Sequence, residues 1–130
     1  MHVLRNVHRS LRPQGRLLDI HPRQEDAPVR AGGRGLGFVE VKKFAPLVAH
    51  VEAVLDDAVA EGWLEPLRRV DREVVERYEE GRELLEKADD WENLRLSAAT
   101  RRRILSSTPP VDVLWPVTFA LFRKRAARQH

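Results

Sequence analysis

The side chains best suited to proton transfer or metal binding in this sequence are its five histidines. A helix presents two metal ligands on one face when they stand three or four residues apart. No two of these histidines have that spacing, and the sequence contains no cysteine, so we predict neither a metal site nor a thiolate nucleophile. The histidines are His2, His8, His21, His50 and His130.

His21 directly follows the apolar run of residues 17–20, which is typical of a short buried strand. Open α/β sheets receive their ligands at the ends of strands, so His21 is a candidate for contact with a substrate. The alternative is a histidine that forms a hydrogen bond with the loop after it. We find no Ser/His/Asp arrangement that the spacing supports, and therefore name no catalytic residue.

Two further segments are of the type that binds anions. A glycine-rich loop such as residues 33–37 can cradle a phosphate when it joins a strand directly to the N-terminus of a helix. The next predicted helix begins only near residue 45, so we expect a flexible loop. The run Arg101-Arg102-Arg103 has no aromatic residues interleaved with it, and we expect it to pair with the acidic middle of the chain or to be solvated. Nucleic acid is therefore not an expected partner.

The composition indicates a single globular domain, residues 1–130. Hydrophobic residues make up 42% of the chain, enough for a core, and the net charge of +3 arises from basic ends around an acidic middle. The uncharged run of residues 113–122 is too short to cross a membrane, and the first residues lack the apolar stretch of a signal peptide. We therefore expect a cytoplasmic protein with no membrane partner.

Helices and strands must hold these residues in place, and hydrophobic spacing predicts where they lie. Helices are predicted at residues 2–12, 45–61, 72–88 and 97–105, the last with Ser97 as its cap. Strands are predicted at residues 17–20, 37–41, 63–70 and 111–122, while residues 22–35 have the composition of a loop. The last strand is apolar on both faces, and its Pro116 marks a bulge or an unpaired amide. Strands separated by helices indicate an α/β layer fold with three or four strands.

Before the first predicted strand the chain reads Arg9-Ser10-Leu11-Arg12-Pro13-Gln14-Gly15. This motif resembles a stretch of class I S-adenosylmethionine-dependent methyltransferases, in which a helix ending in Arg-x-Leu-(Arg/Lys)-Pro-Gly-Gly leads into the fifth strand. Here Gln14 stands in place of the first glycine. Residues 115–124 are similar to the last strand of that family, and the order of elements between the two segments also fits.

The resemblance implies the C-terminal half of that fold, a partial Rossmann-like three-layer sandwich with a small mixed sheet of three to four strands and helices on its faces. In the family's strand order, residues 17–21 lie beside residues 111–123, and residues 63–70 lie outside them. Strand four is then missing, which leaves the 17–21 edge open. We expect a homodimer or a partner chain to cover this edge, or residues 37–41 to fold back over it. In related methyltransferases this end of the strand faces the substrate, which again makes His21 the substrate-side candidate.

The family binds its cofactor with the half of the fold that the resemblance does not cover. We therefore expect no cofactor, no activity of the chain alone, and a role in assembly or partner binding. The alternative is a fragment or subunit of an S-adenosylmethionine-dependent methyltransferase, completed by another chain or by an upstream segment and then able to hold S-adenosylmethionine. A small-ligand or nucleic-acid binding module unrelated to methyl transfer is the third interpretation.

Overall fold

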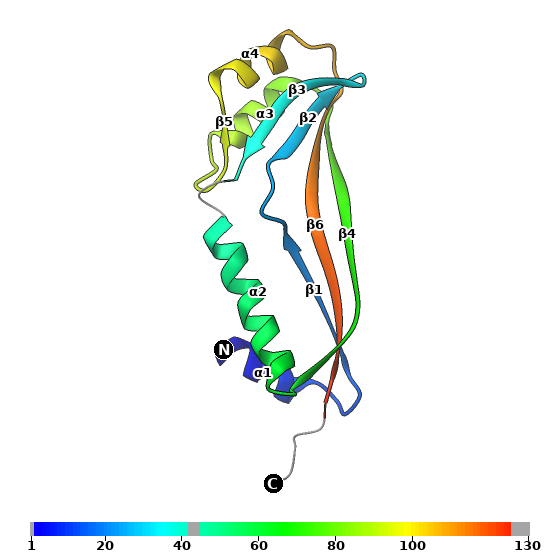
Figure 1. Ribbon diagram of the computed structural model, residues 1–130. Coiled ribbons are helices and arrows are strands. Elements are labelled where there is room, and N and C mark those ends of the chain that lie inside the picture. The colour runs from blue at the N-terminus through cyan, green and yellow to red at the C-terminus, as the bar shows by residue number, and fades with distance from the viewer. Residues whose placement is uncertain (1, 42–44, 126–130) are drawn as a thin grey trace.

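The structure is a computed structural model that describes residues 2–41 and 45–125. The described part forms one antiparallel sheet of six strands, accompanied by four helices (Figure 1). The helices are α1 (His2–Ser10), α2 (Ala45–Ala60), α3 (Gly81–Ala88) and α4 (Ala98–Ser106). The strands are β1 (Arg16–Pro22), β2 (Ala27–Ala31), β3 (Arg34–Glu40), β4 (Leu64–Tyr78), β5 (Arg95–Leu96) and β6 (Val111–Lys124).

Strand β6 is the centre of the sheet. One of its edges pairs with β4 along the whole strand, from Leu64 opposite Lys124 to Tyr78 opposite Val111. Its other edge is shared, because β1 pairs with the C-terminal half of β6 and β2 with the N-terminal end. The sheet continues from β2 through β3 to β5. In Figure 1, β4 and β6 form a long ribbon, and β1 and β2 follow one another along its second edge.

This architecture shows that the expected partial Rossmann-like three-layer sandwich is wrong. Every strand pairing in the described structure is antiparallel, and six strands replace the expected three or four. The largest error lies at residues 72–88, predicted as one helix, because β4 continues to Tyr78 and α3 begins only at Gly81. The β-branched Val74 and Val75 favour an extended chain, and pairing with β6 outweighs the helical spacing of the apolar residues.

The loop predicted at residues 22–35 is also wrong, because β2 and the start of β3 form a hairpin there. Gly32 and Gly33 make its two-residue turn, with φ angles of 57° and 78°. A turn with positive φ at both positions matches the twist of the strands, and glycine adopts it without a steric penalty. The glycine-rich residues 33–37 therefore belong to an ordered hairpin, and β3 begins at Arg34, earlier than predicted.

Other elements follow the sequence pattern closely. Strand β6 confirms the long last strand, α2 confirms the helix at 45–61, and Ser97 caps α4 by accepting a hydrogen bond from the Thr100 amide at 3.2 Å. The expected neighbours are found as well, since β1 lies on one side of β6 and β4 on the other. Of the two alternatives for Pro116, the bulge is wrong, because the β4–β6 register is unshifted at this residue and is irregular only between Pro66 and Arg68. On the other edge of β6, Pro116 lies between the stretches that pair with β1 and with β2.

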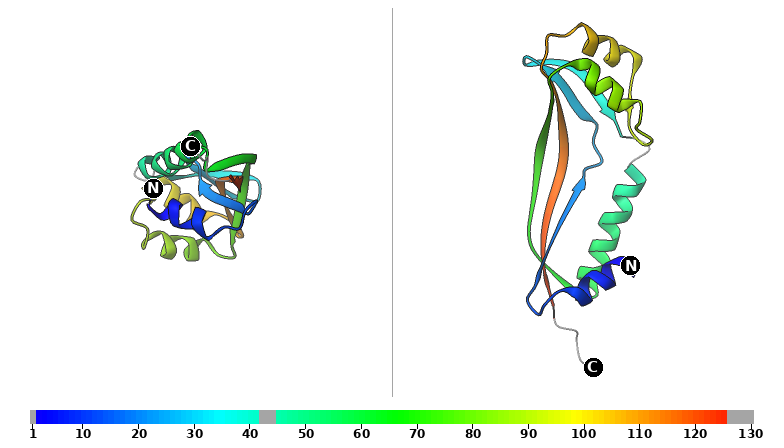
Figure 2. Two further views of the ribbon diagram at one scale, coloured as in Figure 1. Left: turned by 90° about the horizontal axis from the view of Figure 1, so that it is seen from below. Right: turned by 180° about the vertical axis from the view of Figure 1, so that it is seen from behind.

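The sheet carries two hydrophobic cores, one near each end of β6. Successive strand residues point to opposite faces. Val111 and Val113 lie in the upper core with α3 and α4, whereas Ala120 and Phe122 lie in the lower core with α2, so the two cores occupy opposite faces of β6. Because strands twist, all four helices nevertheless lie to one side of the β4–β6 ribbon (Figures 1 and 2). The lower core consists of Leu55, Ala58, Leu64, Ala120 and Phe122.

A polar cluster at the border of the upper core joins β4, β6 and α3. The Glu76 carboxylate accepts hydrogen bonds from the Tyr78 hydroxyl, from Trp115 Nε1 at 3.3 Å and from Lys87 Nζ at 3.0 Å. Burial raises the pKa of Glu76, but these three donors outweigh it and hold the pKa below its ordinary value. Burial, together with the bond to Glu76, raises the pKa of Tyr78 to about 12.

Tyr78 is the only tyrosine of the chain, so ultraviolet absorbance follows its ionisation directly. We expect a midpoint of about 12 in the folded protein. In urea the midpoint should be about 10, the value of an unperturbed tyrosine. Because the fold favours the neutral phenol, the stability that this group contributes is complete below the unfolded pKa and is lost as the pH rises through the folded one.

Glu76→Gln is the matched variant for this titration, because it removes the negative charge and keeps the size of the side chain. The pKa of Tyr78 in this variant should move down toward that of free tyrosine, while far-ultraviolet circular dichroism confirms that the protein is still folded. A titration midpoint of about 10 for Tyr78 in the folded, unsubstituted protein would show that the phenol is neither buried nor bonded to Glu76 as described.

Candidate functional site

The lower half of the sheet has an apolar face that no described helix covers. Leu18 lies opposite Leu121, and Ile20 lies opposite Phe119, so these side chains share one face, which is the face away from the lower core. Val70 joins them from β4, again opposite Phe119. Leu18 and Ile20 are 55% and 56% exposed. We call this surface the open face and define it by Leu18, Ile20, Arg68, Val70, Arg72, Phe119 and Leu121.

The open face is hollowed. Six of its residues line a depression of about 400 Å³, all except Ile20. The depression follows from the pattern of β6, which is apolar on both faces. Helix α2 packs on the side of Ala120 and Phe122, so Phe119 and Leu121 point the other way. Helices α3 and α4 cover that second face only at the upper end, in the core around Val113.

Arginines flank this apolar hollow and have no acidic partner among the described residues. Arg68 and Arg72 lie on the open face, and no described salt bridge includes either of them. Arg69 and Arg77 alternate with them on β4, point to the other face, and contact Glu52, Asp71 and Asp112 there. Neighbouring positions of one strand thus separate into paired arginines on one face and unpaired arginines on the other.

The edge of β1 beside the open face is free within the described structure. Strand β1 pairs with β6, and no other described strand pairs with it. A groove of about 350 Å³ runs beside this edge, lined mainly by apolar side chains of α1, α2 and β1, with Leu4, Leu17 and Val51 among them. The expectation that residues 37–41 fold back over this edge is wrong, because β3 pairs with β2 and β5 instead.

His21, the predicted substrate-side residue, lies on the opposite face of the sheet and is 6% exposed. Its Nδ1 contacts Asp19 Oδ2 from the same strand, and its Nε2 lies 3.2 Å from Glu52 Oε1 on α2. An ionised carboxylate only accepts hydrogen bonds, so the ring donates both bonds when it carries both protons. The alternative expectation, that His21 forms a hydrogen bond with the loop after it, is therefore wrong.

The contacts of His21 favour a structural role, in which it holds α2 against β1. Both ring nitrogens face carboxylates, which leaves neither nitrogen free toward a ligand in this arrangement. Next to it, the buried Thr118 donates a hydrogen bond of 2.8 Å to Asp71. This bond lowers the pKa of Asp71, assisted by the charges of Arg23 and Arg69. Within residues 2–41 and 45–125, no group of three or more His, Cys, Asp or Glu side chains is arranged to hold a metal ion.

The sequence pattern did not bring Arg68 and Arg72 together, because Arg68 lies in the strand predicted at residues 63–70 whereas Arg72 lies in the helix predicted after it. One signal pointed to the open face: the last strand is apolar on both faces and therefore needs cover on each side.

The residues of the run Arg101-Arg102-Arg103 differ in their contacts. Arg101 pairs with Asp89 at 3.2 Å, as expected of contact with the acidic middle segment, whereas Arg102 is exposed.

Replacing His21 with alanine should lower the free energy of unfolding by about 2 kcal/mol, because the variant leaves Asp19 and Glu52 close together without the group between them. Urea unfolding followed by circular dichroism measures this loss. His50→Ala is the matched control, since His50 is an exposed histidine on α2 outside the ion cluster. Equal stability of the two variants would show that His21 does not hold α2 to the sheet.

Within the described residues, no helix is both long and apolar enough to span a membrane. No known protein family, no curated protein and no solved structure matches this chain.

Proposed function

We propose that this protein serves assembly, and that its open face binds an amphipathic, acidic helix of a partner chain. The observation that carries the proposal is the apolar hollow between Leu18, Val70, Phe119 and Leu121, which no described element covers and which unpaired arginines flank. Exposed apolar patches with a polar rim are typical of protein interaction sites. The proposal retains the assembly role expected from the sequence and does not depend on a methyltransferase fold.

A helix is the natural cover for this face, because the protein already covers the opposite face with one. Helix α2 places Leu55 and Ala58 on the sheet and keeps Asp56 and Asp57 exposed. A partner helix with the same pattern would bury its apolar stripe in the hollow. Its acidic residues at the border of that stripe would reach the two arginines that line the hollow and form charge-assisted hydrogen bonds with them.

Three other occupants fit less well. A second copy presenting the same face would bring its own Arg68 and Arg72 against those of the first, which costs electrostatic energy. Single-stranded nucleic acid would need several aromatic side chains for base stacking, and among the described residues Phe119 is the only aromatic one that lines the hollow. A membrane surface favours protruding apolar side chains, whereas this surface is a depression.

The proposal is tested with a designed helical peptide of about 18 residues that carries leucine along one stripe and glutamate elsewhere. Fluorescence anisotropy of the labelled peptide should show saturable binding that weakens as salt is added. The Arg68→Glu/Arg72→Glu variant should weaken this binding about tenfold or more, since it replaces attraction with repulsion. Arg9→Glu/Arg102→Glu makes the same change of charge at exposed helix positions and should leave binding unchanged.

The apolar contribution is tested separately. Leu18→Ser/Ile20→Ser changes side chains that are more than half exposed, so the fold should be kept while peptide binding weakens. Leu105→Ser is the matched control, at an apolar residue of α4 that is 64% exposed. Equal binding of a lysine version of the peptide would overturn the proposal. A stable dimer in light scattering that the Arg68→Glu/Arg72→Glu variant dissociates would overturn it as well, and heat on titration with S-adenosylmethionine would favour the enzyme-subunit alternative.

A further inference from the structure

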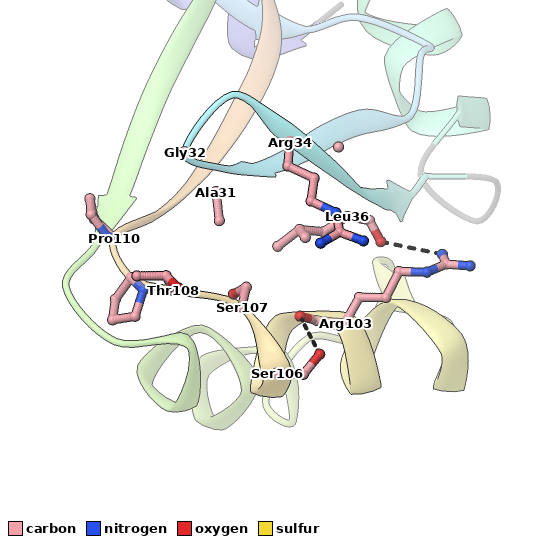
Figure 3. Close-up of a pocket in the computed structure, with 11 residues that line it drawn as sticks. Ala31, Gly32, Arg34, Leu36, Arg103, Ser106, Ser107, Thr108 and Pro110 are labelled. Carbon is pink, nitrogen blue, oxygen red and sulfur yellow. Dashed lines mark hydrogen bonds between the residues drawn. The ribbon is translucent and has the colours of Figure 1, made fainter.

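A second depression lies at the opposite end of the molecule, between the turn of the β2–β3 hairpin and the segment that follows α4 (Figure 3). Its volume is about 480 Å³, within the range of sites for small organic ligands. Its polar lining consists of Arg34 from β3, Arg103 from α4, and the hydroxyls of Ser106, Ser107 and Thr108. It shares no residue with the open face, so the two sites can be tested independently.

The described residues bring a positive charge to this pocket and no acidic side chain that compensates it. None of its lining residues is acidic, and neither Arg34 nor Arg103 belongs to a salt bridge of the described residues. Arg103 Nη1 donates a long hydrogen bond of 3.4 Å to the Leu36 carbonyl, which steadies the side chain and leaves its other N–H groups available. Figure 3 shows the Arg34 side chain extending from the hairpin toward α4.

The C-terminal end of α4 also faces this pocket, and its partial negative charge would oppose an anion. The serines reduce that effect. Ser106 Oγ donates to the Arg103 carbonyl at 3.3 Å, and Ser107 Oγ donates to the Ile104 carbonyl at 2.8 Å, so these terminal carbonyls are occupied. The Thr108 hydroxyl has no hydrogen bond in the described structure and remains available as a donor. Two guanidinium groups and one hydroxyl therefore dominate the pocket.

From this arrangement we infer that the pocket binds a small organic phosphate, with Arg34 and Arg103 holding the phosphate group from opposite walls. A planar guanidinium forms paired hydrogen bonds with phosphate oxygens, and two of them balance the charge of a dianion. The rest of the lining comprises Gly32 and Gly35 of the hairpin and the apolar Ala31, Leu36, Pro109 and Pro110, which suit the carbon skeleton of the ligand. Residues 33–37, expected from the sequence to form a flexible loop, would then contact phosphate through the side chain of Arg34 in a hairpin and not through a backbone cradle.

Isothermal titration calorimetry at low salt tests the pocket with three probes: ribose 5-phosphate, inorganic phosphate and ribose. Ribose 5-phosphate should bind most tightly, inorganic phosphate more weakly because it leaves the apolar walls unfilled, and ribose not detectably. Arg34→Gln/Arg103→Gln should weaken binding of ribose 5-phosphate about tenfold or more. Arg30→Gln/Arg102→Gln removes two exposed arginines, one from the same hairpin and one from α4, outside the pocket, and should leave the affinity unchanged.

Arg34→Gln alone is the safer variant for the fold, since Arg34 makes no described side-chain hydrogen bond or salt bridge, and it should also weaken binding. The inference is wrong if the unsubstituted protein binds neither phosphate probe, or if both double variants bind equally. Binding of a short single-stranded oligonucleotide without binding of ribose 5-phosphate would also overturn it, because the phosphate would then come from a nucleic-acid backbone.

Discussion

Strand β6 is apolar on both faces, and such a strand is stable in water only when other elements cover each side of it. Its edges are satisfied by β4 along one side and by β1 and β2 in turn along the other. Its faces are covered less evenly. Helices α3 and α4 cover one face at the upper end, and α2 covers the other face at the lower end. The positions of these helices on β6 decide which parts of its faces are buried and which remain exposed.

The two cores lie on opposite faces of β6 and near opposite ends of it, which leaves part of each face without a helix. Where α2 covers one face, the opposite face stays open, and Phe119 and Leu121 line a hollow there. The helices are held in place by polar contacts as well as by apolar packing. His21 connects β1 to α2 through Glu52, and Glu76 connects β4 to α3 through Lys87. These contacts join each helix to the face on which its apolar side chains pack, and the apolar surface that no helix covers remains available for a partner.

The two candidate binding surfaces use arginine in different ways. On the open face, Arg68 and Arg72 flank an apolar floor, which suits an extended amphipathic partner. In the pocket at the hairpin turn, Arg34 and Arg103 approach one small volume from two elements, which suits a compact anion. The difference is one of geometry, because β4 spaces its arginines along a face whereas the hairpin and α4 bring theirs together from distant parts of the chain. Charge counts along the sequence do not separate the two cases.

Sequence patterns were reliable where one element decides its own conformation. The broad apolar stripe of residues 45–61 was enough to identify α2, the hydroxyl of Ser97 marked the start of α4, and alternation identified β6. The same reasoning was wrong at residues 72–88, where helical spacing is present locally but pairing with β6 keeps the chain extended to Tyr78. It was wrong at residues 22–35 as well, because Gly32 and Gly33 form the turn of an ordered hairpin there and not part of a loop.

The sequence by itself therefore determined that β6 would be central and that its two apolar faces would both need cover. Tertiary structure alone decided which helix covers which face, because that depends on the pairing register and on contacts such as His21 with Glu52, which join residues far apart in the chain. The binding surfaces arise in the same way. Arg68 with Leu18, and Arg34 with Arg103, become neighbours only after the strands and helices have packed, since local spacing carries no information about contacts across the sheet.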